Sequence, residues 1–260
     1  MKEKSLALLL LVLCLPLSRI QAGGISVDAG LTPAQNRWIL RMQYRYMEMH
    51  NSAMTTKSHM VPFVVAYGVT PKFTLMTRAM YVYKTNSMDQ ASQDGINDIY
   101  LLSKLNLYRK NTPGYVFGIA PHVASNIPVG TVGISNRTWN PEVGINISFR
   151  PRFWAVDFSS SYTFSDMTGR SETDHNDIFE LNTAISVFFP FKNNTSNVLA
   201  PVLEFNYTQS PKILFISPGI SFIHSSLVLE GLIQIPVYQK TDNDLMNQKA
   251  KLILGIRYMF

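Results

Sequence analysis

Hydrophobic and polar residues alternate one by one along most of the chain after residue 36. The stretch 37–49, RWILRMQYRYMEM, places Trp38, Leu40 and Met42 on one side and Arg41 and Arg45 on the other. A period of two residues is typical of a β-strand whose two faces meet different surroundings. The same alternation recurs in 60–69, 73–83, 97–109, 115–123, 142–150, 153–164, 178–189, 199–207, 213–223 (the least regular), 227–237 and 250–260. The pattern predicts about twelve strands.

The connections between these strands fall into two classes that alternate along the chain. The longer ones are 50–58, 85–95, 124–138, 165–176, 208–212 and 238–249, and the shorter ones are 70–72, 110–114, 150–152, 190–197 and 224–226. An even number of strands, with short turns at one rim and long loops at the other, is the layout of bacterial outer-membrane barrels. We therefore expect an all-β fold, a transmembrane antiparallel β-barrel of about 12 strands.

The polar faces of the strands carry few charges, and those charges have both signs. A soluble β-sandwich, the alternative fold, normally exposes a more highly charged face to water. A barrel lumen in which opposite charges pair fits this pattern better, with lipid against the apolar face and aromatic rings at both interfaces. The candidate lumen and selectivity residues are Arg41, Gln43, Arg45, Arg78, Lys104, Glu180, Glu204, Glu230 and Arg257.

The beginning of the chain has the pattern of a secretory signal peptide. A cationic start precedes an apolar run of about a dozen residues, too short for a spanning helix, and a small residue follows at Ala22. We expect a signal peptide at 1–22, a short periplasmic N-terminal segment at 23–36 and an outer-membrane barrel at 37–260. A lipid anchor on Cys14 is the alternative, although Leu13 stands where a small residue is usual.

Charge and cysteine content narrow the functional classes. Removal of residues 1–22 lowers the formal net charge from +6 to +4 and removes the single cysteine. This modest, dispersed excess does not indicate nucleic-acid binding. The expected partners are outer-membrane lipid and lipopolysaccharide, the barrel-assembly machinery and a small-molecule solute, without a cofactor.

The last residues, GIRYMF, resemble the C-terminal signal that the barrel-assembly machinery of bacterial outer membranes reads. Gly255, Tyr258 and the terminal Phe260 carry the resemblance, whereas Ile253 stands where a polar residue is usual. We expect the strand 250–260 to pair with the first strand and close the sheet, because unpaired backbone groups are not tolerated in hydrocarbon. Phe260 should then lie in the periplasmic aromatic girdle.

Several short pieces resemble the outer-membrane transporter family described as meta-pathway of phenol degradation proteins. They are RWILRMQYRY, YGVTPKFTLM, GINDIYLLSKLNLYR, GIAPHVASNIPVGT, ISPGISF, LEGLIQIPVYQ and LILGIRYMF. Together they span nearly the whole chain after the leader. The resemblance implies a barrel that passes small hydrophobic or aromatic compounds inward, and it implies no particular site residues.

Other chemistry has weaker signals. The five histidines lack metal-ligand spacing, so no metal site is expected. His224 and Ser226 resemble the His-x-Ser pair of outer-membrane phospholipase A, which keeps a lipid-processing enzyme as an alternative. A barrel whose extracellular loops bind partners is the other alternative. The acidic stretch 166–177 is typical of a solvated loop, with calcium binding as the other interpretation.

Arg41, Gln43 and Arg45 form a polar column on the first strand. Residues two apart point to the same side, and closure of the sheet brings Arg257 and Glu230 into this neighbourhood. One interpretation is that the arginines only neutralise buried carboxylates. The other is that part of the column stays unpaired and selects anionic or electron-rich aromatic solutes.

Overall fold

The computed structural model of the protein describes residues 24–50, 54–87, 92–135, 137–165, 177–191, 194–240 and 247–260. The proposed leader 1–22 and most of the acidic stretch 166–177 lie outside these ranges. No helix in the described part of the chain is long and apolar enough to span a membrane.

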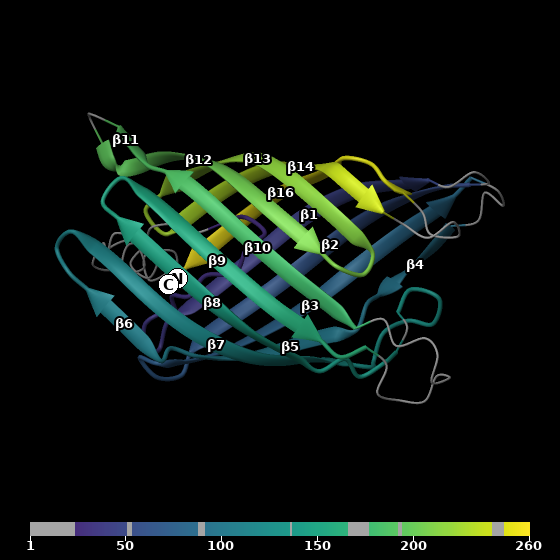
Figure 1. Ribbon diagram of the computed structural model, residues 1–260, viewed down its shortest axis with the longest axis horizontal. Coiled ribbons are helices and arrows are strands. Elements are labelled where there is room, and N and C mark those ends of the chain that lie inside the picture. The colour runs from purple at the N-terminus through teal and green to yellow at the C-terminus, as the bar shows by residue number, and fades with distance from the viewer. Residues whose placement is uncertain are drawn as a thin grey trace, which may run out of the picture.

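Twelve antiparallel strands form the wall of a closed barrel (Figure 1). They are β1 Trp38–His50, β2 Thr55–Gly68, β3 Phe73–Asn86, β5 Ile99–Leu105, β7 Tyr115–Ile127, β8 Glu142–Pro151, β9 Trp154–Thr163, β10 Ile178–Val187, β12 Asn194–Thr208, β13 Lys212–His224, β14 Leu227–Lys240 and β16 Lys251–Met259. Each strand pairs with the next one in this order, and β16 pairs with β1. The expected fold and strand number are confirmed, and a two-sheet sandwich is excluded by this closure.

Four short strands lie next to wall strands in the sequence and pair with the same neighbouring strands as those wall strands do. β4 (Ser92–Ile96) and β6 (Tyr108–Asn111) extend the two ends of β5, β11 (Phe189–Phe191) extends β10, and β15 (Asn247–Gln248) precedes β16. Several strands run further than the alternation predicts: β1 continues to His50 and β7 to Ile127. Polar residues near a loop end can still pair through their backbones, although they interrupt the hydrophobic pattern.

The seam between β1 and β16 closes the sheet as the sequence predicts. Its register runs from Ile39 opposite Met259 to Tyr46 opposite Leu252. The last residue continues the pairing, since the amide of Trp38 donates to the carbonyl of Phe260 at 2.8 Å. The backbone of the final strand is therefore satisfied on both sides, as a hydrocarbon environment requires.

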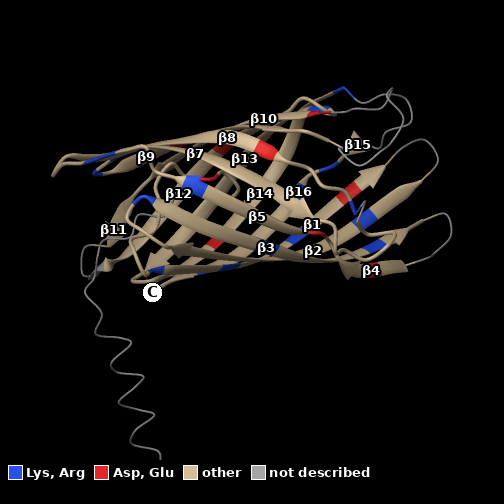
Figure 2. Cartoon of the chain, turned by 90° about the horizontal axis from the view of Figure 1, so that it is seen from below, with Lys and Arg blue, Asp and Glu red and all other residues tan. Residues whose placement is uncertain are grey.

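The outer surface of the wall is apolar and carries two groups of aromatic rings. Phe63 is 45% exposed and Leu254 49% exposed on this surface. Near the C-terminus, the Trp38 and Tyr67 rings lie 4.4 Å apart and those of Tyr258 and Phe260 5.7 Å apart. Figure 2 shows how few charged residues the wall carries. Apolar surface of this extent needs lipid around it, so the protein is a transmembrane barrel of the bacterial outer membrane.

The second aromatic group lies toward the opposite end of β1, β2 and β3. His59 is central to it, with ring centroids 5.1 Å from Tyr46 and 6.0 Å from both Tyr44 and Tyr83. Tyr162 and Phe164 form a further ring pair 5.0 Å apart at the end of β9. Two aromatic levels separated by an aliphatic band match the two interfaces of a membrane.

The segment before β1 does not lie outside the barrel. We expected 23–36 to be a short periplasmic segment, but hydrogen bonds place residues 24–30 among the inward side chains of the wall. We call residues 24–36 the N-terminal segment. Ile25 and Val27 pack there with Ala184, Val202 and Leu232 of the wall. The sequence does not indicate this position, because GGISVDAGLTPAQN has no strand or helix periodicity and its partners are scattered over distant strands.

Candidate functional site: the lumen and the segment that occupies it

Inward residues from β1, β14 and β16 meet at the carboxylate of Glu230. Arg41 Nε donates to Glu230 Oε1 at 2.6 Å, and Arg257 Nη2 donates to Oε2 at 2.7 Å. Gln43 Nε2 adds a third bond at 3.0 Å. Because the side chain of Glu230 is fully buried, these bonds replace the hydration that the carboxylate loses. The expected pairing of Glu230 with the arginine column is present.

Arg41 and Gln43 also hold the N-terminal segment. Arg41 Nη2 donates to the carbonyl of Ile25, and Gln43 Nε2 donates to the same carbonyl at 3.3 Å. Nearby, Arg257 Nη2 donates to the carbonyl of Gly24 at 3.3 Å. The Glu230 cluster therefore provides three donors that fix two successive carbonyls of the segment.

Glu204 of β12 binds the segment from the other side. Its carboxylate accepts from the amide of Ile25, from the amide of Ser26 at 3.1 and 3.2 Å, and from the Ser26 hydroxyl. Asn206 donates to the same hydroxyl at 3.3 Å, and Gln234 lies 3.5 Å from it. Glu204 is completely buried and forms no ion pair with a described residue. Its charge is stabilised by backbone amides of the segment. Strand periodicity could not predict these hydrogen bonds.

A third carboxylate, Asp157 of β9, reaches the beginning of the described chain. Gly24 N donates to Asp157 Oδ2 at 3.2 Å. Arg150 Nη2 donates to both carboxylate oxygens at 2.9 and 3.0 Å, and the Ser148 hydroxyl also donates to Asp157. The alternation places Asp157 and Arg150 on polar faces, but neither is among the candidate residues.

The middle of the segment is attached to the β5 side of the wall. Lys104 Nζ pairs with Asp28 and donates to the carbonyl of Ala29 at 2.9 Å. Asn106 donates to the carbonyl of Gly30 at 3.2 Å. Burial acts to raise the pKa of Asp28, but the ammonium of Lys104 outweighs it and holds this pKa below its usual value.

Gly30 lies so close to the wall that only a glycine fits. A β-carbon there would meet the carbonyl oxygens of Asn146 and Gly118 at 2.7 and 2.8 Å, and Cα of Ile147 at 2.8 Å. All three are backbone atoms of paired strands and cannot yield easily. The amide of Gly30 donates to the Ser148 hydroxyl at 2.8 Å, so the close approach is bonded as well as tight.

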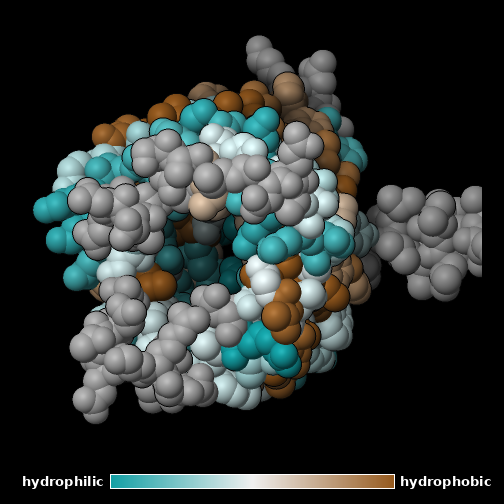
Figure 3. Space-filling view, turned by 90° about the vertical axis from the view of Figure 1, so that its right-hand side faces the viewer, coloured by the Kyte–Doolittle hydropathy of each residue, from teal (hydrophilic) through white to brown (hydrophobic). Residues whose placement is uncertain are grey.

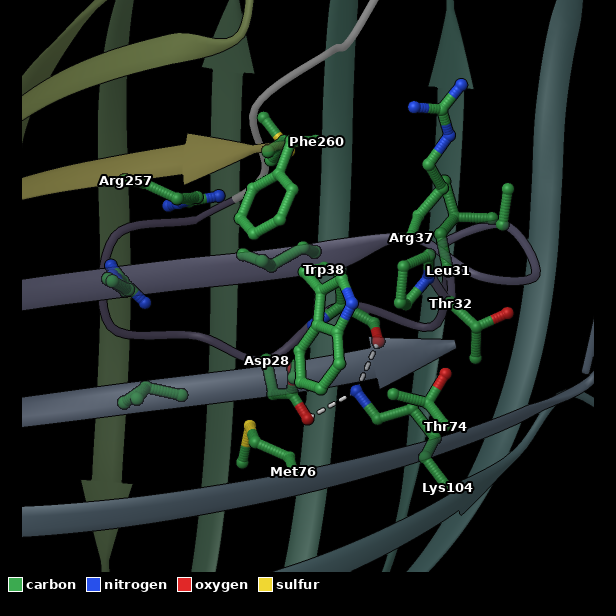
Figure 4. A pocket seen from close by; sticks show the side chains of 18 of the residues that line it. Asp28, Leu31, Thr32, Arg37, Trp38, Thr74, Met76, Lys104, Arg257 and Phe260 are labelled. Carbon is green, nitrogen blue, oxygen red and sulfur yellow. Dashed lines mark hydrogen bonds and ion pairs between the residues drawn. The ribbon is translucent and has the colours of Figure 1, made fainter. Parts of the chain in front are cut away.

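A cavity of about 420 Å³ remains beside the segment, at the end of the barrel where the chain terminates. Figure 4 shows Trp38, Phe260 and Met76 around it, with the Asp28–Lys104 pair on one side and Arg37 on another. The lining is cationic, with Arg37, Lys104, Arg109 and Arg257 among its members. The segment thus fills part of the lumen cross-section without sealing all of it.

The other end of the lumen opens into a hollow. Figure 3 looks into the barrel from the loop end and shows that the visible inner surface of this hollow is mainly hydrophilic. Three inward cations belong to this part: Arg45, Arg78 and Lys251. Arg45 Nε and Nη2 donate to Gln43 Oε1 at 3.1 and 2.7 Å. Among the described residues, none of the three cations forms an ion pair.

A polar network on β5, β7 and β8 borders the same space. His122 Nε2 lies 3.1 Å from Glu142 Oε1, and the Tyr100 hydroxyl donates to the same oxygen at 3.1 Å. The guanidinium of Arg78 lies 4.5 Å from the centre of the Tyr100 ring. The alternation places His122, Tyr100 and Glu142 on inward positions, but only the register between β5, β7 and β8 shows that they meet.

The His224–Ser226 motif does not assemble a nucleophile and its base. His224 Nδ1 lies within hydrogen-bond distance of Asn197 Oδ1, which could orient the ring. Ser226, however, lines the inner cavity, whereas His224 is an exposed residue at the end of β13, and no hydrogen bond joins the two side chains. The geometry does not support the lipid-processing alternative.

The nine candidate residues separate into two groups. Arg41, Gln43, Lys104, Glu204, Glu230 and Arg257 contact the N-terminal segment or each other, whereas Arg45, Arg78 and Glu180 lie on inward positions nearer the loops. Gly255 of the expected assembly signal also lies inward, where a β-carbon would be 2.8 Å from Glu230 Oε1. The described part of the chain holds no group of three side chains suited to a metal ion.

Comparison with solved structures gives one superposition that supports the barrel. An outer membrane channel from Pseudomonas putida F1 superposes with a TM-score of 0.58 at 12% identity, over 92% of this chain and 100% of that chain. The KdgM porin in complex with disordered oligogalacturonate gives 0.48 at 13% identity, over 85% and 99%. The transport unit of the autotransporter AIDA-I from Escherichia coli gives 0.49 at 10% identity, over 94% and 95%.

At such identities the likeness concerns the fold alone. No protein-family model and no curated protein sequence matches the chain. The family suggested by the sequence pieces, the meta-pathway of phenol degradation proteins, is therefore not confirmed. What the closure of the sheet, the lipid-facing surface and the structural likeness establish together is that this chain is an outer-membrane β-barrel.

Proposed function

We propose that the protein is an outer-membrane channel for passive uptake of small organic solutes, including the hydrophobic and aromatic ones implied by the sequence resemblance. One observation carries the proposal: the lumen is polar and open from the loop end, and it is narrowed toward the chain termini by a segment held only by non-covalent bonds. A barrel of twelve strands is wide enough for such a lumen, since eight strands are filled by side chains and 16–18 leave a water channel.

The N-terminal segment is suited to be a movable element of this channel. The wall strands pair with one another around the whole circumference, so the sheet does not need the segment for its backbone hydrogen bonds. The segment, in contrast, depends on wall side chains such as Glu204, Arg41 and Lys104 for its own polar groups. Its displacement would widen the lumen while the barrel stays closed.

The surroundings and processing of the channel follow from the same proposal. Residues 1–22 would be removed as a signal peptide, and the barrel-assembly machinery would read Gly255, Tyr258 and Phe260. Lipid and lipopolysaccharide would cover the apolar wall. Each of these is testable apart from transport, by N-terminal sequencing and by assembly assays.

The experiment that tests the proposed function compares the purified barrel with a variant that lacks residues 24–32, each reconstituted in liposomes. We expect slow swelling of the complete protein in small sugars, and clearly faster swelling of the deletion variant. Folding is checked by the shift in gel mobility on heating that outer-membrane barrels show. Two correctly folded proteins that both leave the liposomes impermeable would contradict the proposal.

A further inference from the structure

Three cations face the hollow beyond the N-terminal segment without a carboxylate partner among the described residues. They are Arg45 of β1, Arg78 of β3 and Lys251 of β16. Across the β1–β16 seam Arg45 pairs with Ile253, two residues from Lys251 on the same face, and across β2 Arg78 stands in the same row as Arg41. The electrostatic interaction of Arg45 with both Arg78 and Lys251 agrees with this placement, so the three side chains share one part of the lumen. Unpaired cations that repel one another are unfavourable in a confined space unless an anion can enter it.

Each of these cations is fixed by a contact that leaves donors available. Arg45 uses Nε and Nη2 on the amide oxygen of Gln43. Lys251 Nζ lies 5.3 Å from the centre of the Phe215 ring, and Arg78 lies over the ring of Tyr100. A cation over an aromatic face keeps its N–H groups for another acceptor. The three side chains are thus held in position, and each keeps N–H groups that can donate to a bound ligand.

The acids around this space do not neutralise the three cations. Glu142 is already engaged by His122 and by the hydroxyl of Tyr100. Glu180 is close enough to Arg78 and Lys251 to interact with them electrostatically, but it forms no ion pair with either. The described side chains of the space therefore carry an excess of positive charge.

We propose that this space, which we call the outer chamber (Arg45, Arg78 and Lys251 with Glu180), is a binding site for the carboxylate of a small organic anion. The inference rests on the proposed channel function and names the class of solute that the channel favours. A carboxylate suits the site because its two oxygens can accept from a guanidinium and an ammonium together. Tyr100, half-buried beside Arg78, provides aromatic surface for the organic part.

The outer chamber adjoins the N-terminal segment on the side of the loops, and Gln43 connects the two. Gln43, which accepts from Arg45, donates to the carbonyl of Ile25 and to Glu230. One amide group therefore separates the proposed site from the closed part of the lumen. A bound carboxylate would be held at the point where the path narrows.

The test is equilibrium dialysis of radiolabelled benzoate against the folded barrel in detergent, with benzyl alcohol as the neutral probe of similar shape. We expect benzoate to bind better than benzyl alcohol. Arg45→Gln, Arg78→Gln and Lys251→Gln should each weaken benzoate binding roughly tenfold, the usual effect of losing one charge-assisted hydrogen bond. Glu180→Gln should strengthen it, because it removes a negative charge from the site without removing a donor.

The matched control is Arg152→Gln, which removes an exposed cation from the turn before β9 and should leave benzoate binding unchanged. Equal binding of benzoate and benzyl alcohol, or weaker binding in Glu180→Gln than in the unaltered barrel, would overturn the inference. So would loss of binding in Arg37→Gln with normal binding in Arg45→Gln, because it would move the site to the cavity beside the segment.

Binding measured in detergent does not depend on transport, so the two proposals can fail separately. A barrel that binds benzoate as expected but stays impermeable without residues 24–32 would reject the channel and keep the site. A permeable barrel with no preference for benzoate would reject the site and keep the channel.

Discussion

At the scale of single residues, two of the buried carboxylates in the lumen have different kinds of partner. Glu230 is neutralised by Arg41 and Arg257, whereas Glu204 is satisfied by amides of the N-terminal segment. A buried charge without such partners would be costly. Glu230 therefore contributes mainly to the wall, and Glu204 contributes mainly to the position of the segment.

The position of Glu204 leads to a prediction for Glu204→Gln. The amide keeps the shape of the side chain but replaces one acceptor by a donor that faces the amides of Ile25 and Ser26. Hydrogen bonds to a charged group are generally worth roughly 1.5–3 kcal/mol, which corresponds to a shift of roughly 10- to 100-fold in the equilibrium of the segment. We expect the variant to spend correspondingly more time in wide openings in single-channel recordings.

The control for this change is Glu48→Gln, which removes a carboxylate paired with Lys249 near the loops. This variant should conduct like the unaltered protein. Identical recordings from Glu204→Gln and Glu48→Gln would show that Glu204 does not hold the segment.

Gly30 provides a second prediction at this scale, on steric rather than electrostatic grounds. In Gly30→Val the added atoms would overlap the wall backbone at Asn146 and Gly118, so the segment cannot keep its place. We expect faster liposome swelling than for the unaltered protein, with the barrel still resistant to denaturation by detergent before heating. Normal swelling of a folded variant would mean that the segment tolerates the displacement.

At the scale of elements, the strands could be predicted from the sequence and the N-terminal segment could not. Alternation is a local signal, and it is sufficient to place Arg41, Lys104, Glu204 and Arg257 on inward faces. The partners of Glu204 are Ile25 and Ser26, which precede it by 179 and 178 residues in the sequence. Such a contact depends on the closed shape of the barrel, which no short pattern encodes.

The assignment of strand faces predicts a large effect of charge on the lipid side. Leu254 of β16 faces outward and is 49% exposed. Leu254→Arg should lower the free energy of unfolding by about 2–4 kcal/mol if the site lies near the membrane midplane. The measurement is urea unfolding in lipid vesicles, with Leu254→Met as the control. An arginine variant as stable as the methionine variant would place this face away from lipid.

At the scale of the whole molecule, the two rims of the barrel differ. The rim that carries Phe260 has short turns such as 69–72 and 225–226, and the other rim carries longer connections, among them 128–141. By the usual layout of outer-membrane barrels the short turns face the periplasm. This orientation makes the outer chamber the first part of the lumen that an external solute meets.

The orientation predicts where a protease can cut on intact cells. Cleavage should occur within 128–138 or within 165–176, and it should spare 70–72 and 150–152. Mass spectrometry of the fragments identifies the sites, and cells with a permeabilised outer membrane serve as the control. Cleavage of the short turns alone on intact cells would reverse the orientation.

Whether the N-terminal segment controls the width of the channel can be decided with a reversible cross-link. The side chains of Ser26 and Asn206 meet at 3.3 Å, and the chain has no cysteine beyond Cys14. The double variant Ser26→Cys with Asn206→Cys can therefore be bridged by a short thiol-reactive cross-linker with an internal disulfide, and released by a reductant in the same bilayer. We predict that single cross-linked channels stay in a low-conductance state and reach wide openings only after reduction, while each single-cysteine variant shows no change in conductance after either treatment. Wide openings of the cross-linked channel, with the cross-link verified, would show that the segment does not control the width.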